Sequence, residues 1–375
     1  MSLGAGQPPG GVLGALAGTS PARRTGGHDR ARAPRRQGEA DTDAQTAPRI
    51  SVVMPVYNAE GLLGECLAAL TASTGVDFEI LVVDDGSTDR SREIAEAHGV
   101  RVIASGGRLG PGGARNRGAE EARGDIVFFV DADVIVRPDT LRRLAGVFAD
   151  PALDGAIAVQ APAMRLRNIC SLYKNLWMYH TYARRAGENV PLFYTTAAAI
   201  RRRAFMEAGG FDRNYTNPNV EDTDFGQKLA RLGHRIQVLP DLEVEHVKGY
   251  DLAGLLRTDY LRSVALARLK LRKRGETMAN DTSVPTGYIV SVPLALLALL
   301  ALLAGLLAGS GPLLLVALGV VGAILVLNRP FLRLLRRHGG TWAWVRGCAI
   351  LVIELLAAGI GSLVGVITYL AGRKY

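Results

Sequence analysis

Two carboxylates one residue apart interrupt a strongly apolar stretch of the chain. Residues Ile126 to Val136 read IVFFVDADVIV, and the apolar run breaks at Asp131 and Asp133 before it resumes. Such a run is typical of a strand buried on both faces, so the two acids lie at or just past its end. Ligands of open α/β sheets bind at this end of the strands, where two carboxylates can share Mg²⁺ or Mn²⁺ with a diphosphate. Taken alone, the motif more often marks a solvated acidic turn.

Further acids follow or open other predicted elements. Asp85 comes just after the apolar run Phe78 to Val83, and Glu221 and Asp222 open a predicted helix. Because parallel strands present their carboxyl ends at one edge of a sheet, we expect these acids to converge there with Asp133 and its neighbours.

The elements that must position these acids alternate between strand and helix from Arg49 to about Tyr250. Short loops join them, so the first half predicts a mostly parallel sheet with helices on both faces, and the second half predicts a mixed arrangement. The predicted strands are residues 50–54, 78–83, 100–104, 126–136, 155–160, 193–200, 236–239 and 242–247. The predicted helices with both ends assigned are residues 59–74, 88–97, 138–148 and 168–185, and Ser87 or Thr88 caps the second of them. Three more are predicted: one that follows the glycine-rich stretch 106–113, a short one that begins at 202, and one that ends near 232.

A dinucleotide-binding oxidoreductase would show the same alternation. Its G-x-G-x-x-G motif should follow the first strand, but the turn there reads Pro55-Val56-Tyr57-Asn58-Ala59-Glu60. A later glycine-rich turn, residues 110–115, has Arg115 where the third glycine should stand. These differences argue against that class.

Six short motifs in order resemble the inverting family 2 glycosyltransferases of the GT-A fold, in their membrane-anchored bacterial type. The resemblance covers about residues 49–250. Each motif alone is weak evidence for the family, but the six motifs together, in this order and at this spacing, are strong evidence. The motifs are Pro55-Val56-Tyr57-Asn58, Asp84-Asp85-Gly86-Ser87-Thr88-Asp89, Gly113-Ala114-Arg115-Asn116-Arg117-Gly118, Asp131-Ala132-Asp133, Gly209-Gly210-Phe211 and Glu221-Asp222. The implied fold is α/β, a Rossmann-like mixed sheet that is followed by C-terminal transmembrane helices.

The resemblance also implies roles for individual residues. Tyr57 would stack near the nucleotide base and Asp85 would hydrogen-bond it, while Asp133 would coordinate Mg²⁺ or Mn²⁺ at the diphosphate and Asp222 would be the general base. The remaining donor-binding residues would be Pro55, Arg115 at the phosphate or base, Asp131 at the ribose or sugar, and Glu221. The donor would be a UDP-, GDP- or dTDP-sugar.

Elementary chemistry supports this division of tasks. A nucleoside diphosphate that leaves an anomeric carbon needs a cation to stabilise its growing charge. A base must reach the acceptor hydroxyl on the opposite face of that carbon. One carboxylate cannot lie on both sides, so Asp133 and Asp222 belong to separate motifs. A single in-line displacement would invert the anomeric centre.

Three basic side chains have a less certain place in this scheme. His246 follows a predicted strand and is assigned as a further metal ligand or diphosphate contact; its alternative is a structural histidine bonded to the backbone. Arg257 and Arg262 lie on a predicted amphipathic helix at 251–273 and could contact phosphate. That helix could lie in a membrane interface or pack on the preceding domain.

The last ninety or so residues contain three apolar segments, 288–307, 312–327 and 348–370, of which the second is short for a membrane span. Arginines precede the first segment and crowd the connection before the third. The positive-inside rule then predicts a multi-pass plasma-membrane protein with a cytoplasmic catalytic domain and Tyr375 on the outer side. Within the third segment, Glu354 is expected to reach toward the interface or to pair with a lipid headgroup. Gly361 and Gly365 have the spacing of a helix-packing motif.

The predicted organisation is therefore a disordered tail at residues 1–48, a glycosyltransferase domain at 49–250, an interface helix and linker at 251–284, and a membrane domain at 285–375. The net charge of +9 fits an anionic membrane surface, and the chain carries no nucleic-acid-reading motif. Three scattered cysteines argue against a disulfide framework or a zinc site.

The expected reaction is transfer of one sugar to a membrane-associated acceptor, which would be a polyprenyl phosphate, a glycolipid or a lipid-linked oligosaccharide. A processive polysaccharide synthase would carry Q-x-x-R-W on the helix after the acidic motif, where this chain has Leu256-Arg257-Thr258-Asp259-Tyr260. A non-catalytic membrane scaffold would be expected to lack Asp133 or Asp222, and a transporter would need polar residues along several spans. Those classes remain as alternatives.

Overall fold

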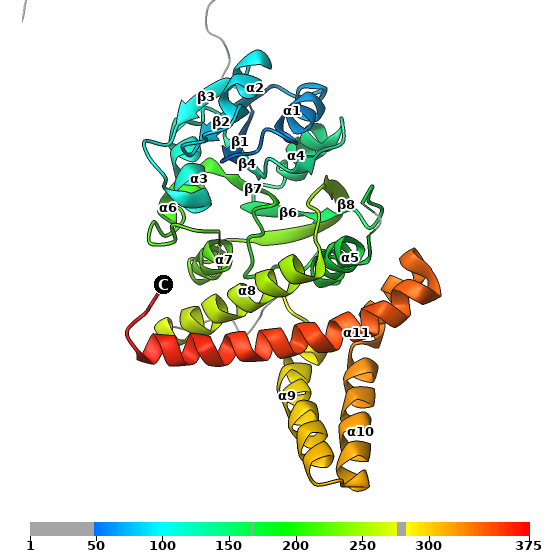
Figure 1. Ribbon diagram of the computed structural model, residues 1–375. Coiled ribbons are helices and arrows are strands. Elements are labelled where there is room, and N and C mark those ends of the chain that lie inside the picture. Colours follow the sequence, from blue (N-terminus) through cyan, green and yellow to red (C-terminus); the bar gives the residue numbers. More distant parts are fainter. Residues whose placement is uncertain (1–48, 167, 219, 276–282) are drawn as a thin grey trace, which may run out of the picture. The chain divides into compact units, whose positions relative to one another are not determined.

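The computed structural model describes residues 49–166, 168–218, 220–275 and 283–375. The predicted disordered tail at residues 1–48 and part of the predicted linker lie outside the described residues. Figure 1 shows the described chain, with its labels used below.

An eight-stranded mixed sheet carries the site. Its order is β3-β2-β1-β4-β7-β6-β8-β5, in which β7 is antiparallel to β4 and β6, and β5 is antiparallel to β8. The other pairs are parallel. The strands are β1 (Ile50–Val56), β2 (Phe78–Asp84), β3 (Arg101–Ala104), β4 (Ile126–Val130), β5 (Val134–Ile135), β6 (Gly155–Gln160), β7 (Ala197–Arg201) and β8 (Ile236–His246).

Two predicted strands, 236–239 and 242–247, are one strand in the structure. β8 continues through both, and its pairing with β6 shifts register between Ala158 and Val159, so that a bulge stands where the prediction placed a break. The predicted run 126–136 is divided instead, because the chain turns at the acidic motif between β4 and β5.

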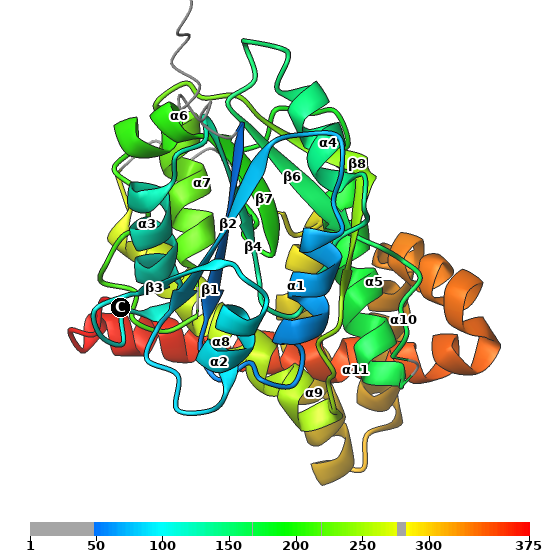
Figure 2. The same cartoon turned by 90° about the horizontal axis from the view of Figure 1, so that it is seen from above.

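Helices cover both faces of the sheet (Figure 2). Alternate strand residues point to opposite faces, so Phe128 packs with α1 (Leu63–Thr71) and α4 (Thr140–Val147), while Phe129 packs with Phe205 and Phe211 on the other face. The remaining helices of this part are α2 (Ser91–Ala97), α3 (Gly110–Glu121), α5 (Ile169–Ala183), α6 (Arg202–Glu207) and α7 (Glu221–Arg231). Residues 126–130 are buried throughout, as a two-sided strand requires.

Four long helices follow. α8 (Leu252–Arg272) packs beneath the sheet domain, and α11 (Arg329–Leu370) lies along α8 (Figure 1). α9 (Thr286–Leu307) and α10 (Gly311–Leu327) form a projecting hairpin. α9 and α11 are long and apolar enough to cross a membrane, and α10 is a shorter apolar helix. The amphipathic helix predicted at residues 251–273 is α8, and it packs on the sheet domain, as one of its two alternatives expected.

The contact between α8 and α11 is close because of two glycines. A Cβ atom built at Gly361 would lie 2.5 Å from the carbonyl oxygen of Tyr260, and one at Gly365 would lie 2.5 Å from that of Val264. The predicted helix-packing role of this glycine pair is confirmed.

Two expectations for the C-terminal region are wrong. Glu354 does not reach a membrane surface, because it is fully buried and accepts a hydrogen bond from the hydroxyl of Tyr173 on α5. Tyr375 does not lie across a membrane from the domain, since its hydroxyl donates to Asp212 at 3.1 Å and accepts from Asn214 at 3.2 Å. Hydropathy carries no information about such tertiary partners.

Candidate active site

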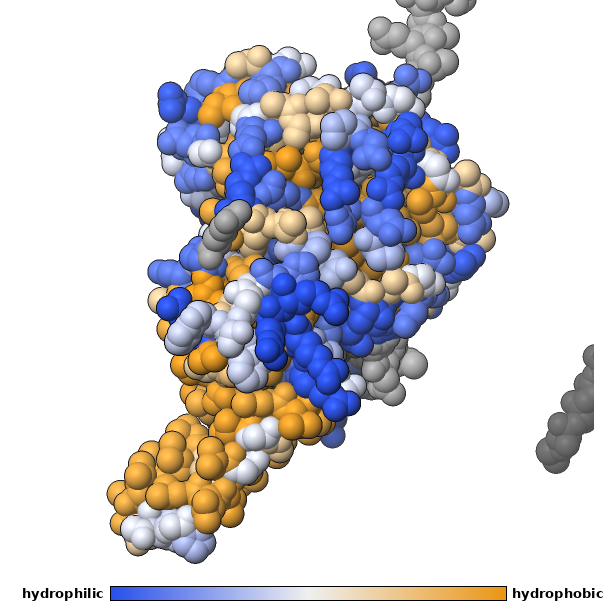
Figure 3. Space-filling model, turned by 90° about the vertical axis from the view of Figure 1, so that its right-hand side faces the viewer, coloured by the Kyte–Doolittle hydropathy of each residue, from blue (hydrophilic) through white to orange (hydrophobic). Residues whose placement is uncertain are grey.

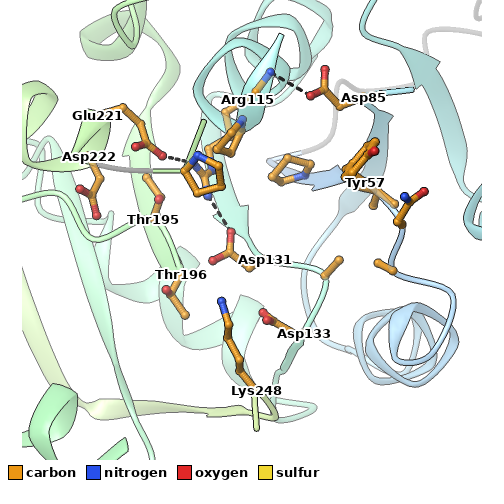
Figure 4. A pocket seen from close by; sticks show the side chains of 18 of the residues that line it. Tyr57, Asp85, Arg115, Asp131, Asp133, Thr195, Thr196, Glu221, Asp222 and Lys248 are labelled. Atoms are coloured by element: carbon orange, nitrogen blue, oxygen red, sulfur yellow. Dashed lines mark hydrogen bonds and ion pairs between the residues drawn. The ribbon is translucent and has the colours of Figure 1, made fainter. Parts of the chain in front are cut away.

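A cleft of about 770 Å³ opens at the carboxyl ends of β1, β2 and β4. Every predicted site residue lines it, from six separate segments of the chain (Figure 4). These residues are Pro55, Tyr57, Asp85, Arg115, Asp131, Asp133, Glu221, Asp222 and His246. The structure thus brings together the residues that the carboxyl-edge argument expected to converge, and their individual roles stay predictions.

The short strand β5 places Asp133 beside His246. Val134 pairs with His246 in the β5–β8 ladder, and Val247 donates its backbone N–H to the carbonyl of Asp133 at 2.8 Å. As a result, His246 Nε2 lies 3.3 Å from Asp133 Oδ1.

The Asp133 carboxylate has features of a cation ligand. Its Oδ1 is buried and makes no hydrogen bond within the described chain. Burial opposes ionisation, but His246 and the ammonium of Lys248 outweigh it and lower the pKa of Asp133. The described residues contain no group of three His, Cys, Asp or Glu that could hold a metal. Two protein ligands still fit Mg²⁺ or Mn²⁺, which are commonly bound by one or two carboxylates together with substrate phosphates.

Arg115 joins two of the predicted donor-binding acids. Its Nη2 lies 2.7 Å from Asp131 Oδ1 and its Nη1 lies 3.3 Å from Glu221 Oε1. The side chain is buried, which disfavours its charge, but the two carboxylates outweigh burial and raise the pKa of Arg115. Burial raises the pKa of Asp131, Arg115 opposes that change, and Asp133 adds to it. The guanidinium thus holds two acids of distant motifs at one wall of the cleft.

Asp85 is engaged with the backbone. Its Oδ1 accepts from the N–H of Leu109 and its Oδ2 from that of Gly110, both at 2.8 Å, where α3 begins. Gly110 has a φ of 77°, and a Cβ there would lie 2.4 Å from the carbonyl oxygen of Thr216. Asp85 therefore fixes the start of the helix that carries Arg115, a role that the sequence did not reveal. Its predicted contact with a base stays a prediction.

The sequence also missed Arg108. Its guanidinium carbon lies 3.3 Å from the centre of the Tyr57 ring, the surface expected to stack on a base. Arg108 stands in the glycine-rich stretch before α3, and a basic residue in such a loop was an available signal.

Asp222 lines the cleft from the first turn of α7, next to Glu221. Its Oδ1 accepts from the backbone N–H of Thr223 at 2.6 Å, and a helix N-terminus favours this negative charge. Arg262 of α8 faces it: burial disfavours the guanidinium, but Asp222 in particular outweighs burial and raises the pKa of Arg262. Arg257 and Arg262 were both named as possible phosphate contacts. Arg262 lines the cleft, whereas Arg257 does not.

Lys248 completes the set of cations. It follows β8 and points into the cleft between Asp133 and Thr196 (Figure 4). The sequence offered no signal for it, because it reaches the site through the pairing of β8 with β5.

The sequence pattern of glycosyl transferase family 2 matches residues 51–209, the segment that contains the sheet edge and most of these motifs. Residues 51–209 thus carry a glycosyl transferase family 2 segment, and glycosyltransferases are among the similar curated proteins. Its sheet, with helices on both faces, has the GT-A fold.

Curated proteins are similar to this chain over about a quarter of its length. The uncharacterized glycosyltransferase EpsJ of Bacillus subtilis is 41% identical over 104 residues, which are 26% of this chain and 29% of EpsJ. The poly(ribitol-phosphate) beta-glucosyltransferase of Bacillus spizizenii is 39% identical over 106 residues, 25% of this chain and 16% of that protein. The chain thus spans less than a third of the length of these curated relatives.

A solved structure covers more of the family 2 chain. The mannosyltransferase PcManGT from Pyrobaculum calidifontis, in complex with GDP-Man and Mn²⁺, has a TM-score of 0.58 and 24% sequence identity. The match covers 85% of this chain and 88% of that one. At this identity the likeness concerns the fold.

Proposed function

We propose that the protein is a metal-dependent inverting glycosyltransferase that moves one sugar from a nucleotide-sugar donor to a membrane-associated acceptor. The observation that carries the proposal is that two acidic centres line one cleft. Asp133 and His246 form one centre and Asp222 forms the other, while Arg115 pairs with a neighbour of each, Asp131 and Glu221.

The donor would bind across the carboxyl ends of the strands. Tyr57, Pro55 and Arg108 border the end of the cleft suited to a base, while Arg115 and Lys248 supply positive charge for phosphate. Asp133 and His246 would hold Mg²⁺ or Mn²⁺, which supplies charge stabilisation for the diphosphate leaving group. PcManGT, solved with GDP-Man and Mn²⁺, and the shared fold support this class of donor and ion.

Asp222 would accept the proton of the acceptor hydroxyl. It accepts from the N–H of Thr223 and lines the same cleft as the acids that follow β4. An acceptor beside Asp222 would approach the sugar from the side away from the diphosphate. Attack from that side inverts the anomeric centre. Arg262 lines the cleft near Asp222, whose carboxylate raises the pKa of Arg262.

The acceptor would be lipid-linked or lie at a membrane surface. The hairpin of α9 and α10 exposes leucines along its length, including Leu300, Leu307 and Leu315 at 64%, 89% and 69% exposure. Hydrophilic side chains border the base of this apolar hairpin (Figure 3). Exposed residues suited to a headgroup region follow it on α11: Arg329, Arg333, Arg336, Arg337, Trp342, Trp344 and Arg346.

We therefore propose that the hairpin enters a plasma membrane from the cytoplasmic side and that α8 and α11 lie at its surface. The chain then returns to the side of the sheet domain, in agreement with the hydrogen bonds of Tyr375 to Asp212 and Asn214. This topology replaces the predicted outward placement of Tyr375.

Two other functions remain as alternatives. A processive synthase would use the same chemistry repeatedly, and a non-catalytic scaffold would keep the fold without turnover. Retention of Asp133 and Asp222 in one cleft favours an enzyme over a scaffold.

The test is release of nucleotide by the full chain in mild detergent from a panel of UDP-, GDP- and dTDP-sugars. Each donor is tested with Mn²⁺ or Mg²⁺, and then with EDTA. We expect one donor to be hydrolysed only with metal, and adding lipid acceptors should then yield a single-sugar product. Absence of both turnover and metal-dependent binding for every donor would remove the proposal in favour of the scaffold.

A further inference from the structure

A small polar chamber branches from the cleft behind His246. Its volume is about 70 Å³, and it lies between β6, α5 and α8. Tyr194, His246 and Arg262 line both the chamber and the cleft, whereas Gln160 and Asn175 line the chamber alone. Because a cavity of ~150 Å³ is needed for a benzene ring, this chamber admits a substituent of a sugar but not the ring itself.

Asn175 brings a free hydrogen-bond acceptor to the chamber. Its side-chain amide nitrogen donates to the carbonyl oxygen of Ala161 at 2.7 Å. A carbonyl can only accept, so this bond fixes the orientation of the amide. Its Oδ1 is buried without a partner in the described part of the chain, and the residue is only 5% exposed. An unpaired buried amide oxygen is costly, so the site favours a ligand that donates a hydrogen bond.

Gln160 brings a second free amide end. Its Nε2 lies 2.8 Å from the hydroxyl of Tyr194 and 3.2 Å from His246 Nδ1, and its Oε1 has no partner among the described residues. Tyr194 and His246 can each donate or accept, so the amide can be turned either way. In both orientations one end stays free, as a donor in one and an acceptor in the other. A hydroxyl group, which donates and accepts, satisfies Asn175 together with either end of Gln160.

The position of the chamber selects the substrate group. The transferred sugar must lie between the diphosphate at Asp133 and the base Asp222. The residues shared by the chamber and the cleft border that space: His246 beside Asp133, and Arg262 beside Asp222. We infer that the chamber binds one hydroxyl or hydroxymethyl substituent of the transferred sugar and that Asn175 and Gln160 determine which sugar is accepted. This inference rests on the proposed function.

The experiment compares binding of a nucleoside diphosphate with binding of its hexose ester, using the pair that the donor panel selects, in the presence of Mn²⁺. Calorimetry on the full chain in detergent gives both dissociation constants. In Asn175→Leu we expect affinity for the hexose ester to fall about tenfold while affinity for the nucleoside diphosphate is unchanged. Unchanged binding of the nucleoside diphosphate also shows that the variant is folded.

The matched control is Thr181→Val. Thr181 lies on the same helix, and its hydroxyl is likewise buried without a partner in the described chain, but it lines neither the cleft nor the chamber. This variant should bind both ligands as the wild type does. A deoxy-hexose donor that lacks the recognised hydroxyl should bind wild type about tenfold more weakly and should lose nothing further in Asn175→Leu.

Three outcomes would overturn the inference. Wild-type affinity of Asn175→Leu for the hexose ester would mean that the chamber holds water alone. An equal loss for both ligands would mean that Asn175 acts on the fold. A raised KM for the acceptor with unchanged donor binding would assign the chamber to an acceptor hydroxyl. If wild type bound no nucleoside diphosphate at all, the proposed function itself would fail, which is distinguishable from these three results.

Discussion

Two clusters of buried charge lie near the site, one at the wide cleft and one whose Lys174 borders the small chamber, and they differ in what faces them. The cleft cluster is Arg115 with Asp131 and Glu221, and it borders an open space of about 770 Å³. The base cluster is Lys174 of α5 paired with Asp259 of α8, close to the Glu354–Tyr173 hydrogen bond with α11.

The physical cost of both clusters is similar, because each removes charged groups from water and compensates them by pairing. The cleft cluster, however, has further acids beside it: Asp133, whose Oδ1 makes no hydrogen bond within the described chain, and Asp222. The base cluster and the neighbouring Glu354–Tyr173 hydrogen bond connect three helices, and their side chains are almost fully buried. Several acids beside a wide cavity thus distinguish a site that a ligand completes from a cluster that holds helices together.

The largest effect is expected for the two catalytic-site acids. Asp133→Ala should abolish transfer and weaken metal-dependent donor binding, because the carboxylate that would hold the ion is lost. Donor turnover with and without EDTA checks this. If this variant kept near-normal activity that EDTA still abolished, Asp133 would not be the residue that holds the metal ion.

Asp222→Asn should reduce transfer by about 10²–10⁴-fold while donor affinity stays near wild type, because the amide keeps the shape but cannot accept the proton. Single-turnover kinetics and donor calorimetry measure the two quantities. A loss of donor affinity equal to the loss of rate would place Asp222 on the donor side instead.

Arg115→Met should weaken donor binding and also lower the free energy of unfolding by about 3 kcal/mol, because it removes the buried cation that pairs with Asp131 and with the buried Glu221. Denaturant titration and calorimetry on the same variant test both. If stability were unchanged, the cleft cluster would not be the compensated charge group described above.

Lys174→Met should lower stability by about 3 kcal/mol, because Asp259 loses its buried partner, yet leave affinity for the nucleoside diphosphate unchanged. Replacing both members, Lys174→Met with Asp259→Leu, should restore part of the lost stability. Equal loss of stability and of nucleotide affinity would contradict the separation of the two clusters.

The smallest effect concerns His180, on the same helix as Lys174. Burial, with a contribution from Arg184, lowers the pKa of His180 to about 4 from an ordinary value of 6.5. The unfolded chain therefore binds a proton that the folded chain does not, and the free energy of unfolding should fall as the pH is lowered from about 6.5 toward 4. Melting temperatures at pH 7 and pH 5 check this, and the change should be smaller in His180→Phe.

The sequence predicted the cleft well because its signals are local. Apolar runs located the strands, and acids at strand ends were placed at one edge by the geometry of parallel sheets. Arg115 was found through its motif, but its bridging of Asp131 and Glu221 depends on residues up to 106 positions away. The part played by Asp85 in fixing α3 was missed for the same reason.

The C-terminal region was harder to predict, because hydropathy does not distinguish lipid from protein as the partner of an apolar helix. Residues 348–370 meet the composition of a span, yet they pack along α8 with Glu354 bonded to a residue 181 positions earlier. Lys248 reaches the cleft through a strand pairing, which has no local signal. Arg108 stands in the glycine-rich loop and Arg262 on the basic helix, where the sequence did offer a signal.

The two-residue strand β5 has a consequence for biosynthesis. Asp133 acquires its neighbour only when β8 pairs with β5, and β8 is translated long after β4 and its acidic motif. A ribosome-bound chain that ends before His246 can form the first parallel strands but cannot assemble the metal-side pair. The cleft is therefore completed late in synthesis, shortly before α8 and the hairpin of α9 and α10 are translated.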